Sequence, residues 1–268
     1  MGKNGKFSIG ITSFAHMHSY SYYHALKSFP DVDIMGIAEE NQASLPKVKT
    51  LPEKLYPNYE ELCKDPAIDC VLVTTENVNH TKVAISALKN NKHVIVEKPI
   101  ATTLEEADEM LKVANNSQGK LVQCYPCRYH PTSQTIKKMF DSNAFGSVLA
   151  ISATNHGRMP PHSGVDEWFS TKSLAGGGAL MDHITHVADL IFWFTGSKIK
   201  SIYATAANLF HPELDIDDAG MVLLEYENGM KVSIDPSWSR PSNFATWGDV
   251  TMTIMGTEKT LTLDMFAQ

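Results

Sequence analysis

The first 123 residues alternate between short apolar runs and longer amphipathic segments, and this alternation limits the folds open to the chain. The apolar runs are rich in valine and isoleucine without polar alternation, as strands buried on both faces are. We expect strands at 7–12, 32–38, 71–74 and 93–96, and helices at 18–28, 79–89 and 104–115. The alternation predicts an α/β domain over residues 1–123, built on a doubly wound parallel sheet.

After about Gln123 the pattern becomes that of an α+β domain. Short helix 133–140 and longer helix 179–194, which ends at a C-cap glycine, are the expected helices. The remaining segments alternate apolar and polar residues, and we expect strands at 148–154, 200–209, 219–226, 231–238, 250–255 and 260–264. Asn228-Gly229 forms a tight hairpin turn between two of them. Residues 124–268 are therefore expected to form a domain with a large, mostly antiparallel open sheet, and to be truncated at the C-terminal end.

Composition excludes several classes of protein. The chain carries 23 Lys+Arg against 30 Asp+Glu, a net charge of −7, which argues against a nucleic-acid partner. No apolar stretch approaches membrane-spanning length, and no signal-peptide pattern opens the chain. Four cysteines are too few for a disulfide scaffold and suit a reducing compartment. We expect a cytoplasmic protein with a small-molecule substrate.

Two motifs place groups that can transfer protons. Lys98, in Glu97-Lys98-Pro99, follows an apolar run that would end at a cleft. Asp182 and His186 follow three glycines and lie four positions apart, on one face of the expected helix. Lysine, carboxylate and imidazole are the groups that proton transfer at a sugar hydroxyl needs. The pattern favours Lys98, Asp182 and His186 as catalytic residues of an NAD(P)-dependent oxidoreductase.

The end of the first expected strand carries a degraded dinucleotide-binding loop. Gly10 and Ala15 fit the first and third positions of G-x-G-x-x-G/A, Phe14 lies within the loop, and Thr12 stands where the second glycine would be. Glu39 ends the second strand, where an acidic residue binds the adenosine ribose. No arginine or lysine adjoins it to hold a 2′-phosphate, so NAD is favoured over NADP. Further cofactor contacts are expected from the segment after the 71–74 strand, at Thr74, Thr75 and Asn77.

Taken together, these residues resemble the glucose–fructose oxidoreductase and inositol dehydrogenase (Gfo/Idh/MocA) family. The resemblance covers essentially the whole chain and includes the following motifs: the degraded glycine loop, Asn79-His80, Glu97-Lys98-Pro99, Arg128 with His130-Pro131, and Gly176-Gly177-Gly178 through Asp182 to His186. It implies a Rossmann domain followed by an open-sheet domain that often forms the oligomer interface. It also implies reversible oxidation of a hydroxyl on a sugar, polyol or cyclitol, and a homodimer or homotetramer.

The resemblance also implies residue roles. Lys98 would orient the reacting hydroxyl or share its proton, His186 would be its acid/base, and Asp182 would tune that chemistry. Glu97 and His80 would contribute to the cofactor site. The peptide bond before Pro99 is expected to be cis, as it commonly is in the family.

Several candidate substrate contacts keep structural alternatives. His18 could touch the substrate or be an exposed helix-start histidine, and His183 could touch it or be a core residue. Arg128 could hold a substrate group or tie the domains together. Trp168 could stack on a sugar, although packing is the commoner role. His156 lies on a loop that would line the pocket.

No metal site is expected, although a zinc site is an alternative. The side chains that could gather around a zinc ion are His156, His162, His183, His186 and Asp182, but they form no compact ligand motif. Cys124 and Cys127 form a C-x-x-C pair without a second pair, and we interpret them as structurally inert.

Three functions are compatible with these patterns. The leading one is an NAD-dependent dehydrogenase that acts on a secondary hydroxyl of a carbohydrate or cyclitol. The second is a glycosidase or epimerase of the same fold that recycles its NAD. The third is a non-catalytic sensor of a nucleotide or sugar, which would have no need of Lys98, Asp182 and His186 together.

Overall fold

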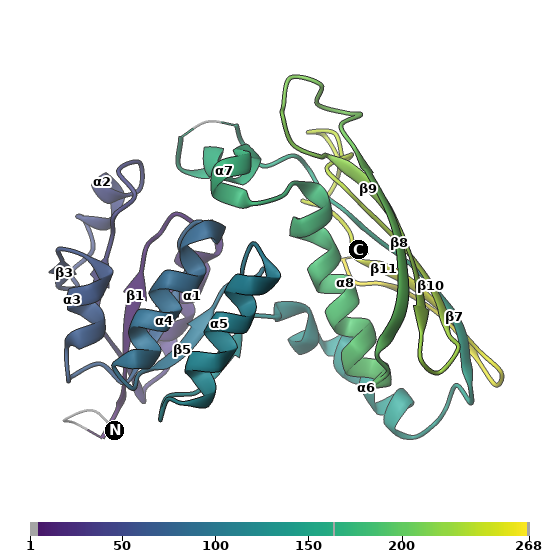
Figure 1. Cartoon of the computed structure of the whole chain (residues 1–268), viewed down its shortest axis with the longest axis horizontal. Coiled ribbons are helices and arrows are strands. Elements are labelled where there is room, and N and C mark those ends of the chain that lie inside the picture. The colour runs from purple at the N-terminus through teal and green to yellow at the C-terminus, as the bar shows by residue number, and fades with distance from the viewer. Residues whose placement is uncertain (1–4, 163, 267–268) are drawn as a thin grey trace. The chain divides into compact units, whose positions relative to one another are not determined.

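The computed structural model describes residues 5–162 and 164–266. The chain forms two compact units (Figure 1). The first consists of Met1–Cys124 and Pro161–Gly176, and the second of Tyr125–Pro160 and Gly177–Gln268. The sequence-based boundary falls at nearly the same place, but it assigns 161–176 to the second domain.

A six-stranded parallel sheet forms the centre of the first unit, in the order β3-β2-β1-β4-β5-β6. The strands are β1 (Phe7–Thr12), β2 (Val32–Ala38), β3 (Leu55–Tyr56), β4 (Cys70–Val73), β5 (His93–Val96) and β6 (Leu121–Gln123). Every residue of β4 is buried, as expected of a strand covered on both faces. The predicted doubly wound sheet is confirmed.

Helices complete the first unit (Figure 1). They are α1 (His18–Ser28), α2 (Leu45–Val48), α3 (Tyr59–Lys64), α4 (His80–Lys89) and α5 (Leu104–Asn115), with 3-10 turns η1 (Asn77–Asn79) and η3 (Gly164–Ser170), and α7 (Lys172–Ala175). The Thr103 hydroxyl caps α5 by accepting a hydrogen bond from the Glu106 amide. Glu106 in turn accepts from the Thr102 amide and hydroxyl.

The segment 161–176 belongs to the first unit because it forms hydrogen bonds with residues of that unit. Trp168 Nε1 donates to the Ala15 carbonyl at 3.0 Å, and Asn77 Nδ2 donates to the Ala175 carbonyl at 2.9 Å. These contacts join residues 98 to 153 positions apart, which no local pattern reveals.

The second unit is a mixed six-stranded sheet, and one long helix covers one of its faces, the inner face. Its strands are β7 (Val148–His156), β8 (Ile199–Ala207), β9 (Ala219–Tyr226), β10 (Lys231–Ser237), β11 (Thr251–Gly256) and β12 (Thr260–Asp264), in the order β12-β11-β7-β10-β9-β8. Only β7 and β10 pair in parallel among the described strands. The predicted, mostly antiparallel sheet is confirmed.

Helix α8 (Ala179–Thr195) supplies the apolar face that buries this sheet. Its residues Val187, Leu190 and Ile191 are fully buried against the strands, and Gly196 ends it in the left-handed conformation. Shorter elements η2 (Pro126–Tyr129) and α6 (Pro131–Asp141) precede β7. The outer face is apolar at β8 and β9, where Tyr203 pairs with Leu223 and both are exposed.

Among residues 5–162 and 164–266, no helix has the length and apolar character needed to cross a membrane.

Candidate functional site

A pocket of about 180 Å³ opens at the carboxyl edge of the parallel sheet. Its lining includes residues from the ends of β1, β2 and β4 and from the turns after them: Thr12, Ala38, Glu40, Asn41, Thr75 and Glu76. Asn41 Nδ2 donates to Glu76 Oε1 at 2.6 Å, which joins the two turns across the pocket. Strand order reverses between β1 and β4, and ligands of such sheets bind at that switch point.

Glu39 itself faces the β1–α1 loop. It is 5% exposed and accepts hydrogen bonds from Ser13 Oγ at 2.8 Å, the Phe14 amide at 2.5 Å and the Asn41 amide at 2.8 Å. Burial raises the pKa of this carboxyl, and the amide and hydroxyl donors offset part of that rise. A ribose contact from Glu39 stays a prediction. Its neighbour Glu40 lines the pocket. Glu40 was not selected from the sequence, although it is acidic and directly follows Glu39.

The β1–α1 loop satisfies most of its own amide groups. The Ala15 amide donates to Ser13 Oγ at 3.0 Å, the His16 amide to the Thr74 carbonyl at 3.1 Å, and the Ser19 amide to the His16 carbonyl at 3.0 Å. Ser13 adopts φ +74°, a conformation that glycine usually supplies. In a glycine-rich loop such amides are available for a pyrophosphate. Here they are already bonded within the chain.

Two residues of the predicted glycine fingerprint serve packing. A Cβ on Gly10 would lie 2.6 Å from Leu62 Cδ2, so glycine there lets α3 approach β1 closely. Thr12 is the last residue of β1, and its hydroxyl donates to the Leu72 carbonyl of β4 at 3.1 Å. Phe14 and Ala15 are fully buried.

The other predicted cofactor residues form hydrogen bonds between neighbouring turns or line the pocket. Thr74 Oγ1 donates to the Ser13 carbonyl at 2.8 Å, and Thr75 lines the pocket. The buried His80 ring lies 2.8 Å from the Pro99 carbonyl and 3.2 Å from the Thr75 carbonyl, and burial lowers its pKa. Asn77 contacts Ala175, as described above.

Glu97 and Lys98 directly follow β5 at the same edge of the sheet. Both side chains are buried, at 0% and 5% exposure. The Lys98 amide donates to Glu97 Oε2 at 2.7 Å, and the Lys98–Pro99 peptide is cis, as expected. A buried charged pair beside the carboxyl edge is the arrangement expected of functional groups rather than of a solvated lysine.

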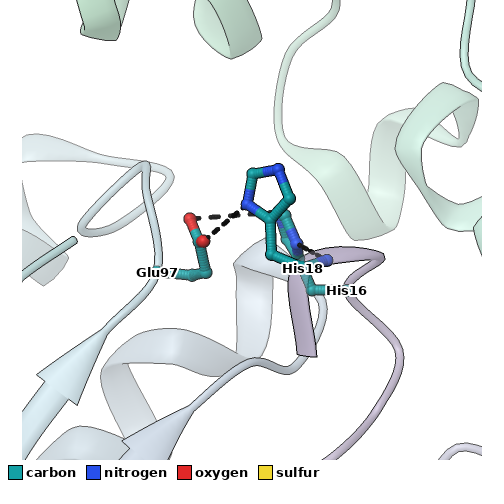
Figure 2. Close-up of side chains that lie close together, drawn as sticks. All are labelled: His16, His18 and Glu97. Carbon is teal, nitrogen blue, oxygen red and sulfur yellow. Dashed lines mark hydrogen bonds and ion pairs between the residues drawn. The ribbon is translucent and has the colours of Figure 1, made fainter. Parts of the chain in front are cut away.

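Two histidines lie close to Glu97, His16 in the β1–α1 loop and His18 at the first residue of α1 (Figure 2). His18 Nδ1 lies 2.8 Å from Glu97 Oε1, and His16 Nε2 lies 4.0 Å from Oε2. The Tyr22 hydroxyl also donates to Oε1, at 2.5 Å. Burial lowers the pKa of His16 to about 3, so its ring is neutral.

Trp168 lies behind these histidines in the first unit. It is 3% exposed and stacks on Phe169 with ring centroids 3.8 Å apart. Its indole N–H bonds to the Ala15 carbonyl. A sugar-stacking platform needs an open ring face, so the packing role fits Trp168 better.

In the second unit, Asp217 holds the start of α8. Its carboxylate accepts from the Gly178 amide at 3.0 Å and the Leu180 amide at 2.8 Å, and its carbonyl accepts from the Ala179 amide at 2.9 Å. A Cβ on Gly178 would lie 1.8 Å from that carbonyl oxygen. The close backbone approach expected of the triple glycine is therefore made to Asp217, which sequence reasoning missed.

Asp182 and His183 form a fixed pair on α8. Asp182 Oδ2 accepts from Trp238 Nε1 at 3.3 Å and lies 3.3 Å from His183 Nε2. His183 is 6% exposed, and its Nδ1 donates to the Asn155 carbonyl at 2.8 Å. Gly157 makes room for this ring, because a Cβ there would lie 2.6 Å from His183 Cε1. The geometry supports a positioning role for His183.

His186 and Arg128 connect α8 to η2. His186 Nδ1 lies 3.8 Å from Cys127 Sγ, and its side chain is half-buried. Arg128 binds Asp189 with two hydrogen bonds, Nε to Oδ2 at 2.7 Å and Nη2 to Oδ1 at 2.5 Å. Arg128 is thus engaged within the second unit, and its contact with a substrate stays a prediction.

His156 lies at the end of β7 in a charged network. Its Nε2 is 3.1 Å from Asp235 Oδ2, its Nδ1 is 3.6 Å from Asp249 Oδ2, and Arg240 also bonds to Asp249. The hydrogen bond with Asp249 is the main cause that raises the pKa of His156, against the opposing effect of burial. Both ring nitrogens of His156 therefore have partners within the chain, and a contact with a substrate stays a prediction.

This network predicts a pH-dependent stability. The raised pKa of folded His156 gives stability that is fully present below the unfolded value of about 6.5 and is lost as the pH rises through the folded value. We expect His156→Gln to lower the free energy of unfolding by about 1 kcal/mol more at pH 6 than at pH 9. Urea denaturation at both pH values checks this, with exposed His24→Gln as control. Equal losses at both pH values would contradict it.

Comparison with known proteins identifies the class. Residues 8–125 match the model of an oxidoreductase family with an NAD-binding Rossmann fold, and residues 133–262 match the GFO/IDH/MocA C-terminal domain. The two models share one family and cover most of the chain. The chain therefore belongs to the Gfo/Idh/MocA oxidoreductases, and the resemblance inferred from its motifs is confirmed.

Relatives with named activities are similar over parts of the chain. Trans-1,2-dihydrobenzene-1,2-diol dehydrogenase of Danio rerio is 31% identical over 65% of this chain and 50% of its own. Myo-inositol 2-dehydrogenase of Thermotoga maritima is 24% identical over 85% and 67%. The structure of a levoglucosan dehydrogenase in complex with NADH and levoglucosan is 25% identical, with a TM-score of 0.84, over 97% of this chain and 73% of that one. The chain spans about half the length of the Danio rerio relative.

Proposed function

We propose that the protein is an NAD-dependent oxidoreductase that acts on a secondary hydroxyl of a sugar, polyol or cyclitol. The observation that carries the proposal is Lys98, a buried lysine directly after β5 at the carboxyl edge of the parallel sheet. Family membership supports the reaction class, because named relatives are dehydrogenases of diols and cyclitols.

The structure suits the adenosine ribose of the cofactor better than its phosphates. The pocket at Thr12, Ala38 and Glu40 suits an adenosine ribose, since its carboxylate can accept from ribose hydroxyls. The pocket lining contains two carboxylates, Glu40 and Glu76, and one lysine, Lys82, a balance that favours NAD over NADP. The loop amides and the His18 and Ser19 amides at the start of α1 are bonded already, so the phosphates would rely on neighbouring side chains. Bound NAD supplies the hydride acceptor.

The chain's own groups would handle the proton. Lys98 in the first unit is proposed to hold the substrate hydroxyl, and His186 in the second to remove its proton. Asp182, fixed by Trp238 and His183, is proposed to orient the acid/base. A histidine suits this task because its usual pKa lies near neutrality.

Calorimetric titration with NADH and NADPH tests the cofactor assignment. We expect NADH to bind more tightly, and Glu40→Ala to weaken it about tenfold, because a hydrogen bond to a charged group contributes about 1.5 kcal/mol or more. Lys82→Ala should leave NADH binding nearly unchanged. Exposed Glu61→Ala on α3 is the control. If folded protein free of retained nucleotide binds neither, the dehydrogenase proposal fails and the sensor function gains support.

We also propose that the apolar outer face of β8 and β9 forms a homodimer or homotetramer contact, as expected from the family. Tyr203 and Leu223 are exposed there and leave an apolar strip. Light scattering that finds only monomers would refute this.

A further inference from the structure

We propose that His16, His18 and Glu97 bind a divalent transition-metal ion. Among the described residues, these are the one group of three histidine, cysteine or carboxylate side chains whose ligand atoms all lie within 4.8 Å of one another (Figure 2). The sequence predicted no metal site and placed the alternative elsewhere, on histidines that the structure divides between its two units. This site goes beyond the proposed hydride transfer.

The ligand set defines the class of ion. Two imidazoles and one carboxylate suit zinc, iron(II), cobalt(II) or manganese(II), whereas calcium and magnesium prefer oxygen ligands alone. Three protein ligands leave at least one position for water or for an oxygen of a substrate. An ion there could polarise a hydroxyl or carbonyl oxygen as a Lewis acid.

One ligand atom lacks a partner. His16 Nε2 is buried and has no hydrogen-bond partner among the described residues. A buried polar atom left in this state costs about 1–3 kcal/mol. It faces Glu97 Oε2 at 4.0 Å, wider than an N–H···O bond but close to the spacing of two ligands on one ion. When the ring proton lies on Nδ1, Nε2 carries a lone pair, and a metal ion would use it.

The surroundings position the carboxylate and leave a way in. Tyr22 and the Lys98 amide each donate to a Glu97 oxygen, and such outer contacts orient metal ligands. His18 is 36% exposed, so an ion can reach the site from solvent. Two features oppose binding: the charge of Lys98 beside Glu97, and the His18 amide, which donates to His16 Nδ1 at 3.2 Å. Binding through Nε2 moves the proton of the His16 ring to Nδ1 and so breaks that long hydrogen bond.

Cobalt(II) is the probe, because its visible spectrum reports nitrogen and oxygen ligands directly. The full chain, freed of metal with a chelator, is titrated with Co²⁺ and separately with Zn²⁺ by calorimetry. We expect one ion per chain. His18→Ala should weaken binding by more than the tenfold to hundredfold typical of outer contacts, and Tyr22→Phe by about tenfold. His24→Ala, on the exposed side of the same helix, should bind as the parent does.

The outcomes separate this proposal from the cofactor assignment. His18 is partly exposed, so its alanine variant should fold, and circular dichroism checks this. NADH titration of the same samples shows whether a variant that loses metal binding still binds the dinucleotide. Substoichiometric uptake, or equal affinity in the parent and His18→Ala, would overturn the metal site even if NADH binds.

Discussion

Replacement of Lys98 by methionine is expected to lower turnover of an alcohol substrate by a factor of about 10² to 10⁴, the usual contribution of a positioned proton-transfer group. Methionine keeps most of the length and apolar contact of lysine but cannot donate a hydrogen bond or carry charge. Lys98 is 5% exposed at the carboxyl end of β5, where a folded sheet presents its reactive groups. The measurement is NADH production from polyols that the parent protein oxidises.

A second buried lysine provides the matched control. Lys92 precedes β5 at the opposite edge of the sheet, is 8% exposed, and donates to the Asp65 and Ile68 carbonyls. Lys92→Met should therefore reduce stability but leave the turnover of folded enzyme nearly unchanged. If both lysine variants lost activity equally, the loss would reflect damage to the fold and the catalytic role of Lys98 would be refuted.

The double variant Lys98→Met/His186→Gln tests whether the two groups serve one step. Groups that act as a unit give strongly non-additive losses, so the double variant should be about as slow as the slower single variant. Multiplied losses would mean that Lys98 and His186 act in different steps.

Gly178→Ala is expected to lower the free energy of unfolding by about 3 kcal/mol or more, at the upper end for overpacking. The added Cβ would lie 1.8 Å from the Asp217 carbonyl oxygen, and backbone cannot rotate aside as a flexible side chain can. Displacing Asp217 would also remove the acceptor for three amides at the start of α8. Chemical denaturation measures the loss.

Gly196, at the other end of α8, is the control for this substitution. It adopts φ +65° with open space around it, so Gly196→Ala should cost only the conformational penalty of about 1–2 kcal/mol. A Gly178→Ala protein as stable as the Gly196→Ala protein would show that the segment around Asp217 moves aside and relieves the expected overpacking.

Local patterns in the sequence predicted both sheets and the long helix. The apolar runs of β1, β2, β4 and β5 are visible because strands that are largely covered on both faces are mostly apolar. The Lys98 motif was equally local, because its strand, its lysine and its proline are consecutive. The spacing of Asp182 and His186 likewise needed only the helical period.

The candidate site was harder to predict where the sequence does not show which of two neighbouring side chains faces the pocket. Glu39 and Glu40 are adjacent in sequence, yet one faces the β1–α1 loop and the other the pocket. Alternation along a strand does not continue through the turn that follows it, so the sequence could not decide between them. The cap from Asp217 and the placement of 161–176 depend on contacts across long stretches of chain.

The sequence by itself determined the fold class, the family and the positions of Lys98, Asp182 and His186, because these follow from periodicity and from consecutive motifs. Only the tertiary structure decided that the β1–α1 loop bonds its own amides and that His16, His18 and Glu97 converge. Glu97 is 79 positions from His18, and parallel strands bring such residues to one edge without leaving any local signal. Burial then makes the unpaired His16 Nε2 chemically significant, because water cannot satisfy it.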